Sequence, residues 1–368
     1  MLGFDLPKFL SAIIQAAPRA GDILLAVGCP PQVLLDGALI RLRMAGLERL
    51  TPFQTEAVVL HLLSLAPAGV AGRVRQEGAA HFAYSVPGVS RFRVAVFSQR
   101  GTYVVVLRSI PERVPVLAEL DLPPAVTQAC GENHGIVLVN GPAGSGRTTT
   151  LAALIGEINA NRACHIVTVE DPIEFLHRHS TATVNQREVG TDTPTLVRGM
   201  HDALRQGAQV LLFAEPGDVE QARIVIEAAE TGHLVLTTLR GYDTASALLR
   251  LLAFFPAEER QDVRRRLAHV LRYAFTQQLV GGAGGRRPVV EVWRATRAAM
   301  DHLVEGELDS QTMADLLRDG ESDGVVCFDR ALESLVRSGG LEIGAALACA
   351  VLPRQLELRL LDVREQAP

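Results

Sequence analysis

The chain has 368 residues, enough for two domains, because a single hydrophobic core rarely grows that large. Hydrophobic residues make up 48% and charged residues 21%, as in an ordinary folded protein, and the net charge of −5 argues against a surface built mainly for nucleic acid. The most apolar stretches, 57–72 and 341–352, are interrupted by polar residues or proline, so neither predicts a membrane span.

The first 111 residues predict a small mixed α/β domain. Spaced apolar residues predict a helix over 6–17, and Thr51-Pro52 predicts the start of a second helix with Thr51 as its N-cap. A turn at Asp36-Gly37 predicts a hairpin. The expected strands cover 23–27, 32–35, 38–43, 91–98 and 102–109.

A proline-containing linker over 112–124 leads to a segment in which strands alternate with helices. The expected strands are 135–140, 165–169, 210–213 and 234–238, and the expected helices are 148–159, 195–206 and 219–230. Such alternation predicts a mainly parallel sheet covered by helices, over 125–295. From Pro256 onward we expect mostly helix with one strand at 289–292, and a helical end over 296–368.

A glycine-rich run follows the first strand of this second domain and opens the next helix. Glycines let backbone N–H groups turn inward around an anion, and the following helix presents its positive end to phosphates. The Thr148 hydroxyl is placed to bind Mg²⁺. The alternative is a purely structural turn. The run predicts an ATP and Mg²⁺ site formed by Gly141, Pro142, Ala143, Gly144, Ser145, Gly146, Arg147, Thr148 and Thr149.

Arg147 departs from the usual phosphate-loop pattern, which has lysine at that position. Lysine is a compact point charge, whereas arginine is longer, planar and forked. The change keeps a positive charge for binding but moves it, and a displacement of about 1 Å can slow a reaction about 100-fold. Lys8 is the only lysine in the chain, so no neighbouring lysine is expected to substitute.

Several further motifs resemble those of the type IV pilus retraction ATPases. The run HIVTVEDPIEF at 165–175 is similar to the Asp box of the secretion and pilus ATPases. Three further runs are similar to motifs of the PilT- and PilU-like retraction branch, namely VPGVSRFRV at 86–94, VNQREV at 184–189 and AAETGHLVL at 228–236. The resemblance extends from about residue 4 to about residue 340, and the sequence lacks a tetracysteine zinc motif.

This resemblance implies a PAS-like N-terminal α/β domain, a RecA-like P-loop NTPase domain with a helical C-terminal end, and assembly into a homohexamer. It implies that Glu170 is the general base, that Glu215 is the Walker B carboxylate that holds Mg²⁺, and that His233 is a phosphate sensor. Arginines at three matching positions would contact the nucleotide, namely Arg93, Arg108 and Arg205. Each of these side chains also has a purely structural interpretation as a solvated or satisfied surface residue.

The match is altered in its catalytic parts. The segment 214–218 is AEPGD where the family has GEMRD, so Pro216 and Gly217 remove an arginine beside Glu215. Arg240 replaces the second histidine of the His box, and His201 replaces an upstream arginine. Together with Arg147, these changes predict that the chain binds ATP but hydrolyses it weakly or not at all when alone.

Two functions follow from the resemblance. The first is a cytoplasmic motor that hydrolyses ATP at the inner membrane and withdraws pilin subunits, with the membrane platform protein of the pilus as its partner. The second is a non-hydrolysing accessory ring that modulates a paralogous retraction ATPase. A RecA-like nucleic-acid motor is disfavoured by the acidic net charge, so no nucleic-acid partner is expected.

Overall fold

The computed structural model describes residues 5–17, 21–35, 38–110, 113–282, 285–320, 324–361 and 363. The chain folds into two compact units. The first comprises Met1–Arg113, Asp171–Leu176 and Glu188–Pro194, and the second Val114–Glu170, His177–Arg187 and Thr195–Pro368. The predicted Asp36-Gly37 turn and the predicted boundary at Pro111 lie outside the described residues.

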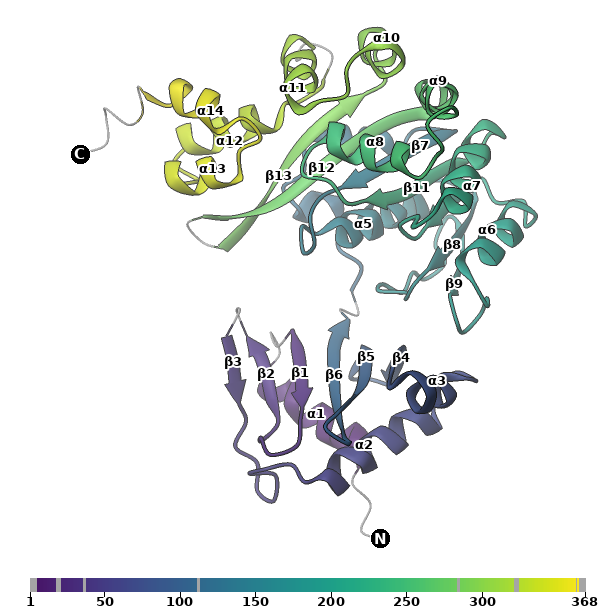
Figure 1. Cartoon of the computed structure of the whole chain (residues 1–368), viewed down its shortest axis with the longest axis vertical. Helices are drawn as coiled ribbons and strands as arrows, with labels where there is room; N and C mark the ends of the chain where they lie inside the picture. The colour runs from purple at the N-terminus through teal and green to yellow at the C-terminus, as the bar shows by residue number, and fades with distance from the viewer. Residues whose placement is uncertain are drawn as a thin grey trace. The chain divides into compact units, whose positions relative to one another are not determined.

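The first unit contains a six-stranded antiparallel sheet with the strand order β3-β2-β1-β6-β5-β4 (Figure 1). Its strands are β1 Asp22–Leu25, β2 Gln32–Leu35, β3 Ala38–Arg41, β4 Ala79–Val86, β5 Ser90–Gln99 and β6 Thr102–Ile110. Its helices are α1 Leu6–Ala16, α2 Pro52–Ser64 and α3 Val70–Glu77. The sequence predicted all of these elements except α3 and β4.

Alternating side chains explain why one face of this sheet is buried. In β5, Phe92, Val94 and Val96 are buried while Arg91 and Arg93 point to the other face. The buried face packs with α1, α2 and α3 into one core. The predicted N-cap of α2 is confirmed, because Thr51 accepts a hydrogen bond from the Gln54 backbone N–H and completes a capping box.

The second unit is built on a seven-stranded sheet with the order β13-β12-β7-β11-β10-β8-β9. Its strands are β7 Gly135–Asn140, β8 His165–Glu170, β9 Thr183–Glu188, β10 Val210–Phe213, β11 Leu234–Leu239, β12 Leu271–Gly282 and β13 Gly285–Arg294. Strands β12, β7, β11, β10 and β8 run parallel, and β13 is antiparallel to β12. The predicted parallel α/β sheet is therefore confirmed.

Helices cover both faces of this sheet. Val137, Val139 and Leu236 on one face pack against α4 and α5, while the alternate residues Leu138 and Val235 are equally buried on the face contacted by α7, α8 and α9. Before the C-terminal end, the helical segments of this unit are the short 3-10 turn η1 Leu117–Glu119 and the helices α4 Pro124–Ala129, α5 Arg147–Asn161, α6 Leu196–Leu204, α7 Val219–Glu230, α8 Thr244–Ala253 and α9 Arg260–Val270.

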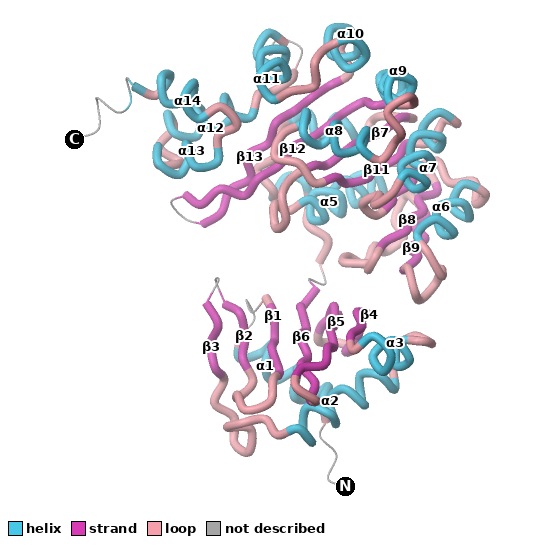
Figure 2. The backbone as a smooth tube through the Cα atoms, viewed as in Figure 1, coloured by secondary structure: helices cyan, strands magenta, loops and turns pink. Residues whose placement is uncertain are grey.

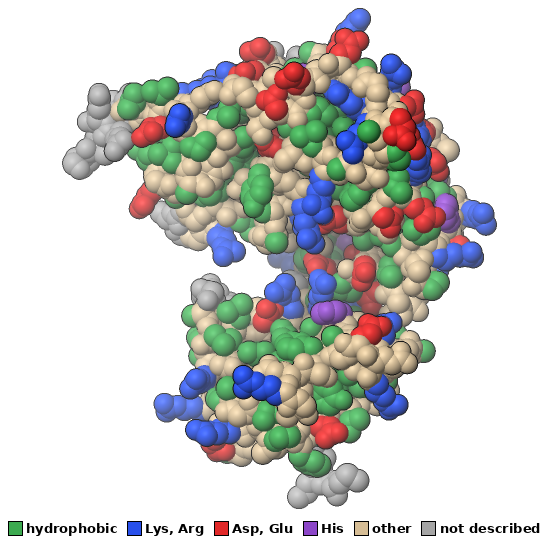
Figure 3. All heavy atoms as spheres, in the orientation of Figure 1, with side chains coloured by type: hydrophobic (Ala, Val, Ile, Leu, Met, Phe, Trp, Pro, Cys, Tyr) green, Lys and Arg blue, Asp and Glu red, His purple; other side chains and the backbone are tan. Residues whose placement is uncertain are grey.

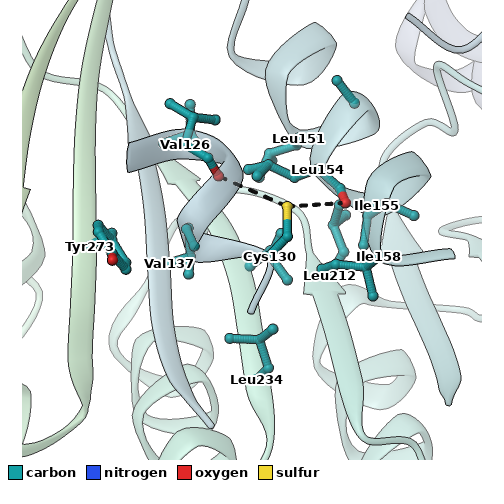
Figure 4. Close-up of a cluster of buried hydrophobic side chains, with 14 of the residues drawn as sticks. Val126, Cys130, Val137, Leu151, Leu154, Ile155, Ile158, Leu212, Leu234 and Tyr273 are labelled. Carbon is teal, nitrogen blue, oxygen red and sulfur yellow. Dashed lines mark hydrogen bonds between the residues drawn. The ribbon is translucent and has the colours of Figure 1, made fainter. Parts of the chain in front are cut away.

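The core between α4, α5 and the sheet contains a buried thiol at its centre (Figure 4). Cys130 lies 3.9 Å from the carbonyl oxygens of Val126 and Leu154, and burial raises the pKa of its thiol to about 12. All five cysteines are free, as the scattered spacing predicts. Cys130 is therefore a packing residue and remains a thiol at neutral pH.

The expectation of helix from Pro256 up to the strand at 289–292 is wrong for 271–282, which forms the long strand β12. This strand lies between β7 and β13, so its side chains over 273–277 are buried on both faces and show no polar–apolar alternation. Burial on both faces is why the sequence pattern alone did not distinguish it from a buried helix.

The helical C-terminal end is confirmed (Figure 2). It consists of α10 Arg297–Glu305, α11 Ser310–Asp319, α12 Phe328–Arg337, α13 Ile343–Cys349 and α14 Pro353–Arg359. Phe328, Leu332 and Val336 of α12 pack with Val280 of β12 and Val289 of β13. None of the helices in the described part of the chain is long and apolar enough to cross a membrane.

Candidate nucleotide-binding site

The carboxyl ends of four parallel strands bring most of the predicted site residues to one edge of the second unit. Gly141 follows β7, Arg240 follows β11, Glu215 lies two residues beyond β10, and Glu170 ends β8. Ligands of open α/β sheets bind at this edge, where the chain leaves the strands in loops. Residues that are far apart in the sequence therefore lie together at the carboxyl ends of these strands.

The phosphate loop has the backbone that its glycines predict. Gly141, Gly144 and Gly146 have φ angles of 150°, 76° and 91°, which side-chain-bearing residues rarely adopt. A Cβ on Gly141 would lie 2.3 Å from the carbonyl oxygen of Gln277, so the close approach also requires glycine. Ser145 Oγ is buried and, among the described residues, has no hydrogen-bond partner, so it is available to an oxygen of a bound phosphate.

Gln277 of β12 holds the loop from one side, a role that the sequence analysis missed. Its Nε2 donates to the Ser145 carbonyl at 2.7 Å, and its Oε1 accepts from Thr150 Oγ1 at 2.7 Å. The side chain is 3% exposed. Burying an amide group costs free energy unless the group is hydrogen-bonded. A glutamine within an apolar segment was therefore the sequence signal that could have indicated this role.

Arg147 is turned toward the neighbouring strand ends. Its Nη1 donates to the Leu239 carbonyl at 2.9 Å and to Glu215 Oε2 at 3.2 Å, and its side chain is only 14% exposed. Arg240 Nε donates to the same Glu215 oxygen at 3.3 Å. The structure therefore brings Arg147, Glu215 and Arg240 into one ion cluster beside the loop.

The residues present fit a nucleotide better than they fit Mg²⁺. The glycine backbone, the start of α5 and the buried Ser145 hydroxyl suit a polyphosphate. A magnesium ion prefers carboxylate and hydroxyl oxygens, here Glu215 and Thr148. Because Glu215 Oε2 already accepts from two guanidinium groups, the arrangement as it stands does not fit a divalent cation.

Glu170 lies on the same edge but is held by other partners. Its Oε1 accepts from Thr168 Oγ1 at 2.6 Å and from Gln186 Nε2 at 3.1 Å. Strands β10 and β11 separate β8 from β7, which at the usual strand spacing places Glu170 about 14 Å across the sheet from the loop strand. The carboxylate is oriented by its neighbours, and its role as general base stays a prediction.

The structure does not bring His233 and Arg205 to this cluster. His233 precedes β11 and Arg205 precedes β10, so both lie at the amino ends of strands whose carboxyl ends face the loop. His233 Nδ1 lies 2.9 Å from the Ala228 carbonyl, which ties the ring to the end of α7. Within one chain, the length of β11 separates His233 from the phosphate loop, and its role as a phosphate sensor stays a prediction, as does the contact of Arg205 with the nucleotide.

Arg93 and Arg108, which belong to the first unit, are direct neighbours across β5 and β6. Arg108 makes a bidentate ion pair with Asp22 at 2.7 and 2.9 Å, which raises the pKa of its guanidinium. Arg93 Nη1 lies 3.7 Å from Glu174 Oε1. Their contact with a nucleotide stays a prediction.

Basic and acidic side chains are interspersed over the face drawn in Figure 3.

A mainly parallel sheet with helices on both faces, and a glycine-rich loop between the inner strand β7 and helix α5, define a P-loop protein with a RecA-like domain. The chain belongs to the Type II/IV secretion system protein family, whose model matches residues 70–284.

Two relatives and one solved structure resemble nearly the whole chain. The type IV pilus retraction ATPase PilT and the type IV pilus ATPase PilU of Pseudomonas aeruginosa are each 34% identical, over 91% and 97% of this chain and 95% and 91% of their own lengths. A crystal structure of the pilus retraction motor PilT with bound ADP matches with a TM-score of 0.84 at 33% identity, covering 95% of this chain and 98% of that one. The chain is thus homologous to the retraction ATPases, and the predicted resemblance is confirmed.

Proposed function

We propose that this protein is an ATP-binding subunit of a type IV pilus retraction machine that hydrolyses ATP slowly when it acts alone. The observation that carries the proposal is the ion cluster at the phosphate loop. The loop retains the geometry of a nucleotide site, but Arg147, which replaces the lysine of the motif, is engaged by the Leu239 carbonyl and Glu215.

Slow turnover follows from the chemistry of this cluster. Phosphoryl transfer depends on positive charge placed against the transferred phosphate, and little covalent chemistry is left to the protein. In this chain the arginine has to leave two hydrogen bonds, to Leu239 and Glu215, before it can reach a phosphate. Binding tolerates a displaced charge better than the transition state does.

The test compares the purified protein with Arg147→Lys and Glu170→Gln. We expect calorimetry to show saturable ATP binding by all three, and phosphate release by the unmodified protein at least about tenfold slower than by Arg147→Lys. Brisk hydrolysis by the unmodified protein, abolished by Glu170→Gln, would contradict slow turnover. Absence of ATP binding under every condition would remove the nucleotide function itself.

A second function, an accessory ring without hydrolysis of its own, is favoured by the same cluster and by the Pro216-Gly217 change beside Glu215. The two functions predict different results for phosphate release by a partner ATPase and by the Arg147→Lys variant. An accessory subunit is expected to change phosphate release by an active retraction ATPase while Arg147→Lys restores no turnover of its own, whereas a slow motor gains turnover from Arg147→Lys alone.

The proposal extends to assembly and location. We expect six copies in a ring at the cytoplasmic face of the inner membrane, docked on the pilus platform protein and, in the accessory case, on a paralogous ATPase. The support is homology to PilT and PilU over nearly the full chain. Electron microscopy with nucleotide checks the ring, and a monomer at micromolar concentration would count against it.

A further inference from the structure

One oxygen of Glu215 accepts hydrogen bonds from two arginines that come from different elements. Arg147 opens α5 within the phosphate loop, and Arg240 follows β11. The two donor nitrogens lie 3.2 and 3.3 Å from Oε2. We propose that Arg147 and Arg240 together supply the positive charge that balances a bound triphosphate, so that this chain binds ATP without a divalent metal ion; this inference rests on the proposed nucleotide site.

Both guanidinium groups are anchored where a phosphate held by the loop lies within side-chain length. Leu239 pairs with Asn140, the residue before Gly141, so Arg240 leaves its strand beside the first glycine of the loop, at a neighbouring-strand spacing of about 5 Å. Its side chain is 65% exposed, which leaves it free to turn toward a ligand. Arg147 belongs to the loop itself.

Arg240 replaces part of the charge that a metal ion would bring. Arg147 keeps the charge of the lysine whose position it takes, and Arg240 adds one positive charge where a divalent ion would add two. Guanidinium groups bind phosphate oxygens in a bidentate manner and lose less hydration than an ammonium does. A cation approaching Glu215 would meet both guanidinium groups and be repelled by them, so the metal gains little at the position where it usually binds.

Arg240 is therefore a nucleotide-binding residue and the one that determines metal dependence. The rest of the loop needs no metal to keep its shape, because Gln277 bonds both Ser145 and Thr150. The energetic difference between metal-free and metal-bound ATP should then depend on the side chain at position 240 more than on any residue of the glycine run.

The experiment is an ATP titration of the full-length protein by calorimetry, once with excess Mg²⁺ and once with excess EDTA, at one ionic strength. The variants are Arg240→His, which removes the permanent charge, and Arg240→Lys, which restores charge without the fork. Arg297→Gln is the matched control, because that arginine is 93% exposed on α10. Thermal melting confirms that each variant is folded.

We expect chelation to weaken ATP binding by less than about fivefold in the unmodified protein and in Arg297→Gln. In Arg240→His it should weaken binding by about tenfold or more, and Arg240→Lys should lie between. A loss above fivefold in the unmodified protein, or an Arg240→His variant that is as insensitive to EDTA as the control, overturns the inference while leaving nucleotide binding intact. No binding in either buffer refutes the nucleotide site as well.

Discussion

Glu291 provides a sharp test of the second unit because it is a carboxyl group buried between strands and helices. It lies on β13, is 2% exposed, and accepts a hydrogen bond from the Thr244 backbone N–H at 2.8 Å. Burial raises its pKa from 4.5 to about 7. Thr244 and Thr276 lie 3.1 Å apart, and Asn140 donates to Thr276, so the carboxyl group connects to the strand that carries the phosphate loop.

The sign of the pH effect follows from the raised pKa. Between pH 4.5 and 7 the folded chain keeps a proton that the unfolded chain has lost, so the free energy of unfolding falls as the pH rises. Over this range, each pH unit lowers the free energy of unfolding by about 1.4 kcal/mol. Glu291→Gln keeps the acceptor for Thr244 but cannot ionise. The advantage of the variant over the unmodified protein should therefore grow by about 2.5 kcal/mol from about pH 5 to about pH 8.

Urea unfolding followed by tryptophan fluorescence measures this difference. Trp293 is the only tryptophan in the chain, is fully buried, and lies two residues from Glu291 on the same strand, so its signal reports unfolding of this sheet. Glu305→Gln on the exposed side of α10 is the control for a lost carboxylate. Parallel pH profiles for Glu291→Gln and the unmodified protein would refute a buried carboxyl group with a raised pKa.

Three further changes test the loop and the first unit. Gln277→Met removes two buried hydrogen bonds and should lower the unfolding free energy by about 2–4 kcal/mol in urea titrations, with weaker ATP binding by calorimetry. Gly146→Ala places a Cβ 2.7 Å from Gln277 Nε2 at a φ of 91°, so ATP affinity should fall more than tenfold. Thr51→Ala breaks the capping box of α2 and should destabilise the first unit by about 1 kcal/mol in thermal unfolding, with ATP affinity unchanged.

Most of the fold was predictable because local patterns and tertiary burial agree. Strands β7 and β10 and helix α7 begin and end at the predicted residues, since each is a short apolar run or an amphipathic segment bounded by turn residues or a capping side chain. The glycine loop was predictable for the same reason, because its spacing reflects backbone angles that only glycine adopts readily.

The rest depended on contacts between distant segments. Strand β12 has no alternation because it is buried on both faces, so Gln277, 131 residues beyond Gly146, had no visible link to the loop. The partnership of Arg147 with Glu215 and Arg240 required knowledge of which strand ends are neighbours. His233 was assigned from its motif, and only the strand direction shows that it lies at the opposite edge of the sheet from the loop.

We expect the changes at positions 217 and 240 to compensate one another. The family motif that 214–218 resembles has an arginine at the position of Gly217, and this chain has Arg240 where the family has histidine, so one arginine is lost near Glu215 and another is gained. A Cβ on Gly217 would meet only Gln221 Oε1 at 3.9 Å, so there is room for a side chain. When Gly217→Arg is added to the Arg240→His variant, we therefore expect it to restore most of the metal-free ATP affinity that Arg240→His loses. The affinity is measured by calorimetry in EDTA. If Gly217→Gln restores as much as Gly217→Arg, the compensation is not one of charge.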